Sequence, residues 1–351
     1  MATPTGVATR LVLQQTLVKP SGGLFAMTVF IIRRLLQALV VVTLMSFLVF
    51  AGVFLIGDPV EIYVNDDADQ EEREMIIKEM GLDKPFIVQY GIFLDNAVSG
   101  DLGESFVFDE PALELILERM PATLELAVVS LLIAVILGIP LGVWAGLKPE
   151  TYGARTIMTG SILGFSLPTF WVGIMMIVLF AVTLGWLPST GRGEVEYVMG
   201  IPTSLHNWKG FSHILMPAIN LALFNLSLVI RLARAGTREV VHQDYVKFAR
   251  AKGLSQKRIV LVHIMKNIMI PVVTVLGLEF GGLLAFSVVT ETVFAWPGMG
   301  KLLIDSIGQL DRPVIVAYLM IIVMMFVVIN LVVDVMYSIL DPRVRLQDVK
   351  A

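Results

Sequence analysis

Glu279 is the side chain whose setting most suggests chemistry, because it interrupts a long apolar run at Gly277–Gly282. A carboxylate deep in an apolar span is costly, so it is protonated, paired with another span or facing a wet pathway. The neighbouring glycines leave room for a solute, and we therefore predict that Glu279 and Gly281 line such a pathway. A structural hydrogen bond is the alternative. Glu125 lies near the outer end of its apolar run and can reach the interface, whereas Asp334 is a candidate helix-packing partner.

Bond-making chemistry has no visible site in this sequence. The phosphate-binding pattern GxxxxGK[ST] is absent, because Gly300-Lys301 is followed by Leu302 and preceded by Ala295 where the first glycine is needed. Neither HExxH nor GxSxG occurs, and the four histidines show no metal-ligand spacing. Without cysteine there are no disulfides and no cysteine-ligated metals. We therefore expect no catalytic residue, metal or cofactor, and no nucleic-acid partner.

The composition is that of a membrane protein. Hydrophobic residues make up 56% of the 351 residues and charged residues 16%, with a mean hydropathy of +0.80, whereas soluble chains are about 45–50% apolar and about 25% charged. We predict an all-α membrane protein with six transmembrane helices. Residues 1–26 form an N-terminal tail, and Met27 is a possible translation start. The predicted spans are 27–56, 124–147, 157–187, 214–230, 268–294 and 314–340.

Two polar segments fix the predicted orientation. Residues 57–119 hold 17 acidic and 4 basic residues, a net charge of −13, whereas residues 231–267 hold 9 basic and 2 acidic residues, a net charge of +7. Lysine and arginine mark the cytoplasmic side. We therefore place the acidic segment 57–120 outside the cytoplasm, and the basic segment and both chain termini inside it. The acidic segment is a candidate docking surface, unless its charge reflects only orientation and solubility.

Glycine and proline predict how the second and third spans pack. Glycines recur every fourth residue over Gly138–Gly146 and create a helix face that another helix can approach closely, so we predict packing rather than a pore lining. Pro121 suits the first turn of the second span. Pro168, in the run that starts at Ser166, should kink the third span and free a carbonyl that needs a neighbouring helix or a water-lined cavity. Ser166 and Pro168 are therefore further pathway candidates.

The basic segment predicts a helix, a glycine and a second helix. Gly253 suits a helix end in the left-handed conformation, with Leu254 placed for the hydrophobic contact of that cap. Ser255 is a plausible N-cap for the second helix. A solvated basic loop is the alternative. The face predicted for the first helix consists of Val241, Tyr245, Phe248 and Lys252.

Several sequence blocks, in the same order, resemble the dipeptide/oligopeptide/nickel-type permeases of the ABC importers. The most specific are cytoplasmic: Tyr245-Val246, Ala249–Ser255, His263, Asn267 and Ile270–Thr274. The others are Gly81–Pro85, Gly100–Gly103, Pro121–Leu126, Ser166–Pro168, Thr290–Phe294, Trp296–Gly300 and Asp341–Arg343. The resemblance covers nearly all of the chain from about residue 27 onwards.

The resemblance implies a type I ABC importer permease in a bacterial inner membrane, with residues 121–351 as its core. It implies a second homologous permease, two cytoplasmic ATP-binding subunits and an extracytoplasmic solute-binding protein. The loop at 231–267 would couple to the ATPase through Tyr245, Ala249, Arg250, Ala251, Lys252, Gly253, Leu254 and Ser255. The general importer motif begins Glu-Ala-Ala, but this chain has Lys247, Phe248 and Ala249 there, so no role of that glutamate carries over.

The resemblance leaves the solute open. Similar permeases handle peptides, glutathione-like thiols, nickel chelates, opines and some sugars. The leading hypothesis is a permease subunit, itself no enzyme, of an ATP-driven importer for di- or oligopeptides or a related small solute. An ATP-independent secondary transporter or channel is the alternative.

Overall fold

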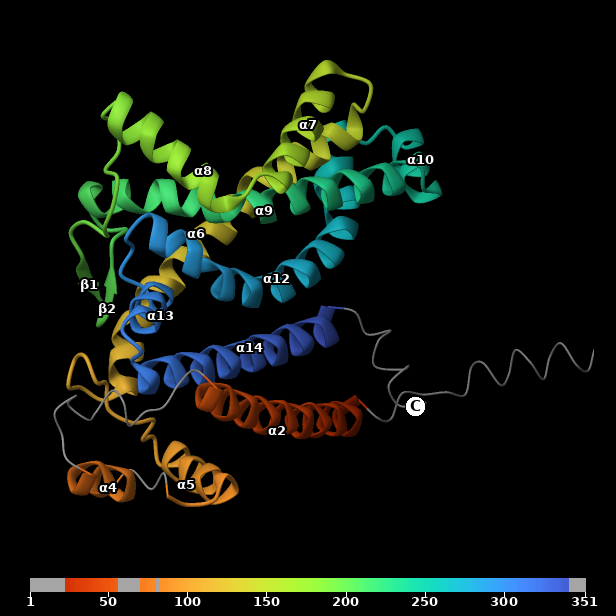
Figure 1. Ribbon diagram of the computed structural model, residues 1–351. Helices are drawn as coiled ribbons and strands as arrows, with labels where there is room; N and C mark the ends of the chain where they lie inside the picture. The colour runs from red at the N-terminus through yellow and green to blue at the C-terminus, as the bar shows by residue number, and fades with distance from the viewer. Residues whose placement is uncertain (1–22, 56–69, 80–82, 341–351) are drawn as a thin grey trace, which may run out of the picture.

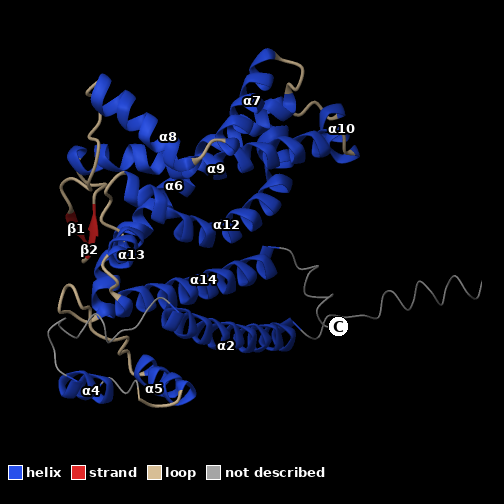
Figure 2. Ribbon diagram, in the orientation of Figure 1, coloured by secondary structure: helices blue, strands red, loops and turns tan. Residues whose placement is uncertain are grey.

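The chain folds into a bundle of long apolar helices. A computed structural model describes residues 23–55, 70–79 and 83–340, and Figures 1 and 2 show helices throughout with a single short hairpin. Five of the described helices are long and apolar enough to cross a membrane, or six if one bent pair counts as a span. The elements are α2 (Gly23–Leu55), α4 (Gln70–Glu79), α5 (Phe86–Val98), α6 (Ala112–Leu147), α7 (Tyr152–Ser166), α8 (Thr169–Met176), η1 (Ile177–Thr183), β1 (Glu196–Val198), β2 (Ile201–Thr203), α9 (Trp208–Val241), α10 (Asp244–Ala251), α11 (Gln256–Arg258), η2 (Ile259–Ile264), α12 (Met265–Val293), α13 (Met299–Gly308) and α14 (Arg312–Leu340).

The helices have longer bounds than the sequence predicts at several spans. Helix α6 begins at Ala112, so Pro121 lies inside the helix and the prediction of a first-turn proline is wrong. The stretch before Pro121 adds buried apolar residues such as Leu115 and Ile116 to the core, which stabilises a helix despite the hydrogen bond that proline removes. Helix α9 likewise runs past the predicted end of its span, up to Val241. Residues 1–22 of the predicted N-terminal tail, residues 57–69 and 80–82 of the acidic segment, and the C-terminal Asp341–Arg343 lie outside the described residues, whereas residues 23–26 of the tail belong to α2.

Helices α6 and α9 form the most extensive helix pair, and the predicted glycine face is where they meet. Gly138 lies against Val229, Gly142 against the carbonyl oxygen of Ile230, and Gly146 against Thr237. All three glycines are buried. Close approach through small residues is the usual way in which membrane helices pack, because lipid offers no hydrophobic drive for association. The predicted packing role is thus confirmed.

Replacing Gly142 by valine is expected to destabilise the bundle. Its β-carbon alone would lie 2.5 Å from the Ile230 carbonyl oxygen, so α6 and α9 must separate. Overpacking of this kind costs about 1–3 kcal/mol. Gly160 is the matched control, because it is also helical but has no neighbouring atom within 4 Å of its added β-carbon. Thermal melting of the detergent-purified protein checks the difference, and equal melting of the two valine variants would contradict it.

The region predicted as the third span is divided into separate helices rather than merely kinked. Helices α7 and α8 meet at Leu167-Pro168 with a bend of 107°. Pro168 has no N–H and stands as the N-cap of α8, so the carbonyl of Gly164 loses its helical partner. Beside the break, Phe165 stacks on Phe224 of α9 at 4.9 Å between ring centroids. The predicted effect of Pro168 is therefore confirmed and is larger than a kink.

Figure 1 shows two distinct ends of the bundle. The hairpin, α4, α5 and α13 lie at one end, here named the hairpin end, and α10 lies at the other, the α10 end. Helices α2 and α14 run side by side and are joined by the ion pair Arg34–Asp334 at 3.0 Å. Asp334 is therefore a helix-packing partner, as its position in the sequence indicates.

Candidate functional site

The polar segment between α9 and α12 begins with a tight corner. Helix α9 ends at Val241, and α10 starts three residues later at Asp244. Val241 and Tyr245 therefore belong to different helices, and the prediction of one continuous face through both residues is wrong. The corner turns α10 away from the axis of α9 at the end of the bundle (Figure 1).

Helix α10 is held against the bundle by a small buried face. Val246 and Ala249 join a core cluster that includes Ile259 and Ile264 of the following segment. Ala249 is only 3% exposed. A small side chain at Ala249 therefore brings α10 close to this chain's own core, rather than to a partner as its predicted coupling role requires.

Gly253 ends α10 as the sequence predicts. Its φ is +77°, in the left-handed region. The N–H of Gly253 donates to the carbonyl of Arg250 at 2.9 Å, and that of Leu254 donates to Ala249 at 3.2 Å. These two bonds define a Schellman cap, and Leu254 packs against the core cluster beneath it. Ser255 then caps α11 by accepting the N–H of Arg258, so the predicted helix, glycine and helix are confirmed.

The outward face of α10 is aromatic and basic. Tyr245 is 43% exposed and Phe248 is 62% exposed. The ammonium of Lys252 lies 4.6 Å from the centroid of the Phe248 ring, and the rings of Tyr245 and His263 are 6.4 Å apart. Partial burial, and next the charge of Glu239, raise the pKa of Tyr245, so its hydroxyl stays neutral. Arg250, Ala251 and Ser255 are exposed around this face.

The first two pathway candidates lie at the break of the third span. Ser166 ends α7 and Pro168 precedes α8, and both are exposed. The Ser166 hydroxyl donates to the carbonyl of Ile162 at 2.8 Å, a contact that bends helices. The exposed break and the freed carbonyl of Gly164 give this point a polar character inside an apolar span.

The other two candidates lie on different faces of α12. Gly281 is buried, and its added β-carbon would meet the ring of Phe326 on α14, while Gly277 faces Val333 in the same way. Side chains of α14 therefore fill the space beside these glycines, and the expectation that the glycines leave room for a solute is wrong. Glu279 lies two residues away, which is about 200° around the helix, and is partly exposed. Among the described residues, its carboxylate makes neither a hydrogen bond nor an ion pair.

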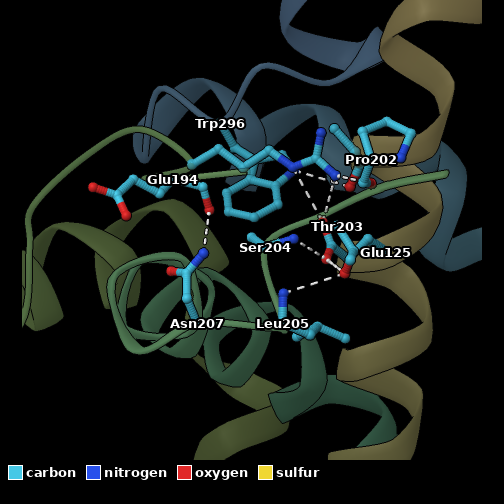
Figure 3. A network of polar contacts seen from close by, with 10 residues as sticks. Glu125, Glu194, Pro202, Thr203, Ser204, Leu205, Asn207 and Trp296 are labelled. Atoms are coloured by element: carbon cyan, nitrogen blue, oxygen red, sulfur yellow. Dashed lines mark hydrogen bonds and ion pairs between the residues drawn. The ribbon is translucent and has the colours of Figure 1, made fainter. Parts of the chain in front are cut away.

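Sequence reasoning missed a buried ion pair at the hairpin end (Figure 3). Arg192 donates to Glu125 through Nη2 at 2.6 Å and Nε at 3.1 Å. The same carboxylate accepts the hydroxyl of Thr203 and the N–H of Ser204, both at 2.7 Å. Arg192 and Glu125 are only 10% and 7% exposed. Glu125 thus ties the hairpin to α6 rather than reaching the interface, and nothing in the spacing of these residues signals the pair.

A second buried carboxylate, Glu291, lies close to this ion pair. It accounts for polar residues in three of the sequence blocks that carry the family resemblance. Glu291 is fully buried and accepts the hydroxyl of Thr123 at 2.8 Å and the N–H of Lys301 at 3.0 Å. Trp296 donates through its indole N–H to the carbonyl of Ala122 at 2.9 Å. These bonds join α6, α12 and α13. The polar residues of these blocks therefore hold the hairpin end together.

The comparisons with known proteins agree with this architecture. The MetNI methionine ABC transporter, solved in inward-facing conformations, superposes with a TM-score of 0.51 over 65% of this chain and 96% of that chain, at 18% identity. The fold is thus that of a type I ABC importer permease. The chain belongs to the family of binding-protein-dependent transport system inner membrane components, whose model matches residues 138–346; the model of the family's N-terminal region matches residues 27–127.

Curated relatives match the chain almost end to end. The di/tripeptide transport system permease protein DppB of Pseudomonas aeruginosa is 40% identical over 91% of this chain and 99% of its own length. The glutathione transport system permease protein GsiC of Escherichia coli is 38% identical over 90% of this chain and 98% of its own length. The protein is therefore a multi-pass inner membrane permease that works with other components of an ABC importer.

Proposed function

We propose that this permease imports di- or oligopeptides, or a related small solute such as glutathione, into a bacterial cell. It pairs with a second homologous permease above two ATP-binding subunits, and an extracytoplasmic solute-binding protein delivers the solute. In this arrangement the α10 end and both chain termini are cytoplasmic, and the hairpin end is extracytoplasmic. The chain hydrolyses no ATP itself. The 40% identity to a di/tripeptide permease supports the solute class.

The exposed face of α10 is the observation that carries this proposal. The aromatic side chains of Tyr245 and Phe248 are exposed at the end of the bundle beside exposed cations, while the opposite face of α10 is fixed by Val246 and Ala249. Exposed aromatic residues on a rigid element are typical of a protein interface. The basic charge of the segment supports a position on the cytoplasmic side, where nucleotide is available. The ATP-binding subunit is the partner that this position favours.

The broken span supports a pathway near Ser166 and Pro168. A carbonyl freed in mid-membrane is tolerated only where protein covers it or water reaches it. The described part of the chain leaves the break exposed, so lipid alone would leave this backbone unsatisfied. The second permease or an aqueous pathway between the two subunits meets the requirement. Glu279 belongs to the same proposal, since a charged side chain in the membrane needs a wet or paired setting.

Reconstitution tests the proposed function directly. The permease is placed in proteoliposomes with its second permease, ATP-binding subunits and solute-binding protein, and uptake of labelled di- and tripeptides is followed. We expect uptake only with ATP inside and the complete set of subunits. Uptake by the permease alone, without ATPase subunits, would establish a secondary transporter or channel instead.

Replacing Glu279 by glutamine is expected to change the selectivity of uptake while the protein is still inserted. A negative charge about 6 Å from a passing solute in a wet channel favours cationic peptides about threefold over neutral ones. The variant should lose that preference in competition assays between lysine-containing and alanine-containing dipeptides. If only the amount of inserted protein changes, Glu279 serves a structural hydrogen bond.

A further inference from the structure

The loop before α9 forms a preformed apolar projection. Strands β1 and β2 pair in register from Glu196–Thr203 to Val198–Ile201, which leaves Met199 and Gly200 as a two-residue turn. Both turn residues have positive φ, +52° and +82°, as the tightest hairpin turns require. Met199 is 97% exposed at the tip. A methionine held in the left-handed region is strained, and such a conformation persists only where the surroundings impose it.

The buried ion pair supplies that constraint. Arg192 donates hydrogen bonds to the carboxylate of Glu125 at 2.6 Å and to the carbonyl of Pro202 at 2.8 Å. The hydroxyl of Thr203 donates to the same carboxylate. The guanidinium of Arg192 also lies 5.6 Å from the centroid of the buried Trp296 ring. The base of the hairpin is therefore fixed to α6 and to the loop before α13 (Figure 3). Burying two charges is costly, and a simple connection between spans would not need it.

The hairpin surface has the anatomy of a docking site. Its exposed apolar side chains include Tyr197, Met199 and Ile201, and ion-paired side chains flank the hairpin. An open groove of about 350 Å³ runs along it, lined by Val198, Ile201, Thr203, Leu205 and His206. An apolar centre within a polar rim is the common pattern of a protein interface, and methionine adapts well to a partner surface.

The flanking charges exclude lipid as the occupant. Glu194 and Glu196 stand at the base of β1, where they pair with Lys209 and His206. All four side chains are about half exposed or more. Placing these four side chains in the hydrocarbon core of a membrane would desolvate charged groups at high cost. With His206 counted as neutral, these four side chains carry a net charge of only −1, so the matching surface needs to be apolar rather than strongly charged.

We propose that the β1–β2 hairpin, with Met199 at its tip, docks into an apolar depression on the solute-binding protein. This proposal rests on the proposed function, which puts the hairpin end outside the cytoplasm. The family depends on a binding protein, and that partner must approach the end opposite to the ATPase contact. The rigid hairpin then sets where the binding protein releases its solute. The site differs from the acidic segment 57–120 that the sequence indicates as a docking candidate.

Site-specific photocrosslinking tests the contact. The chain has no cysteine, so Met199→Cys is the only cysteine that it brings to the complete transporter. The other subunits and the solute-binding protein are made free of cysteine, the site is labelled with a maleimide benzophenone, and the complex is held in lipid nanodiscs. We expect an ultraviolet-dependent adduct between the two chains. Adducts only with the second permease or with lipid would overturn the proposal. Absence of any adduct, while the binding protein still stimulates the ATPase of the same sample, would do the same.

A pair of substitutions separates polarity from backbone strain. Aspartate tolerates the left-handed conformation, so Met199→Asp keeps the turn and only makes its tip charged. Met199→Leu keeps the tip apolar and is the matched control. We expect the Asp variant to bind the solute-binding protein at least about tenfold more weakly, with an unchanged melting midpoint, and the Leu variant to bind like the wild type. Wild-type affinity in Met199→Asp would overturn the proposal.

The same measurement of binding between the transporter and the solute-binding protein separates this proposal from the proposed function. If the wild-type transporter neither binds nor responds to a solute-binding protein, the proposed function fails and the hairpin proposal falls with it. If the wild type responds and Val98→Asp, in the acidic segment, weakens binding while Met199→Asp does not, only the hairpin proposal is lost. Val98 is 89% exposed, so it offers that rival surface a comparable test.

Discussion

Gly253→Val is expected to leave the permease inserted but to abolish ATP-driven uptake. Gly253 has a φ of +77°, and a left-handed backbone costs an ordinary residue about 1–2 kcal/mol, with a further penalty for a β-branched one. The backbone at residue 253 of the valine variant therefore shifts toward the right-handed region. This shift breaks the two hydrogen bonds of the cap, which go to the carbonyls of Arg250 and Ala249. Helix α10 then loses its fixed angle to α11 and can no longer move rigidly with a partner.

Gly253→Asn is the matched control for this effect. Asparagine is similar in volume to valine but adopts the left-handed conformation readily. A β-carbon added at Gly253 meets no atom of the chain within 4 Å. We expect the Asn variant to retain most uptake, whereas Val loses it. Uptake in proteoliposomes and copurification of the ATP-binding subunits measure both outcomes. Normal uptake by Gly253→Val in an intact complex would refute the coupling role.

Arg192→Met is expected to be among the most destabilising single changes at the hairpin end. It removes one partner of an ion pair in which both side chains are at most 10% exposed. Breaking a buried pair from one side costs about 3–5 kcal/mol, since the remaining charge is left uncompensated. The melting midpoint of the detergent-purified protein should fall clearly, and the hairpin should become sensitive to protease before the bundle does.

The double variant Arg192→Met with Glu125→Gln should recover most of that loss. Glutamine removes the stranded charge, and its carbonyl oxygen still accepts the hydrogen bonds from Thr203 and Ser204. Lys209→Met breaks the exposed pair with Glu194 instead and should leave the midpoint unchanged, since surface pairs contribute little. A double variant no more stable than Arg192→Met alone would show that the lost hydrogen bonds to arginine, not the charge, dominate.

The segments that local rules govern could be predicted from the sequence. Left-handed caps, serine N-caps and proline breaks depend on a few neighbouring residues, so Gly253, Ser255 and Pro168 were placed correctly. The glycine face of α6 was predictable because its period of four matches a helix face. The fold class follows from hydropathy, which needs no tertiary information.

Features that depend on contacts between distant parts of the sequence could not be predicted from local rules. Arg192 and Glu125 are 67 residues apart, and no periodicity links a loop arginine to a helix carboxylate. The glycines around Glu279 suggested space, but Phe326 and Val333 of α14 fill it. Ala249 suggested contact with a partner, whereas it packs against the chain's own core. In each case the neighbour that decides the role comes from another part of the chain.

Helix α9 runs from the hairpin end of the molecule to its α10 end (Figure 1). Its 34 residues extend about 51 Å at about 1.5 Å per residue, against a hydrocarbon core about 30 Å thick. It starts at the Asn207 cap beside the hairpin and ends at the corner before α10. A tilt of about 10° about its hairpin end would displace its α10 end by about 9 Å if the helix moves as one rod, with Pro217 inside it. A small rotation at the hairpin end is thereby amplified into a large movement at the α10 end.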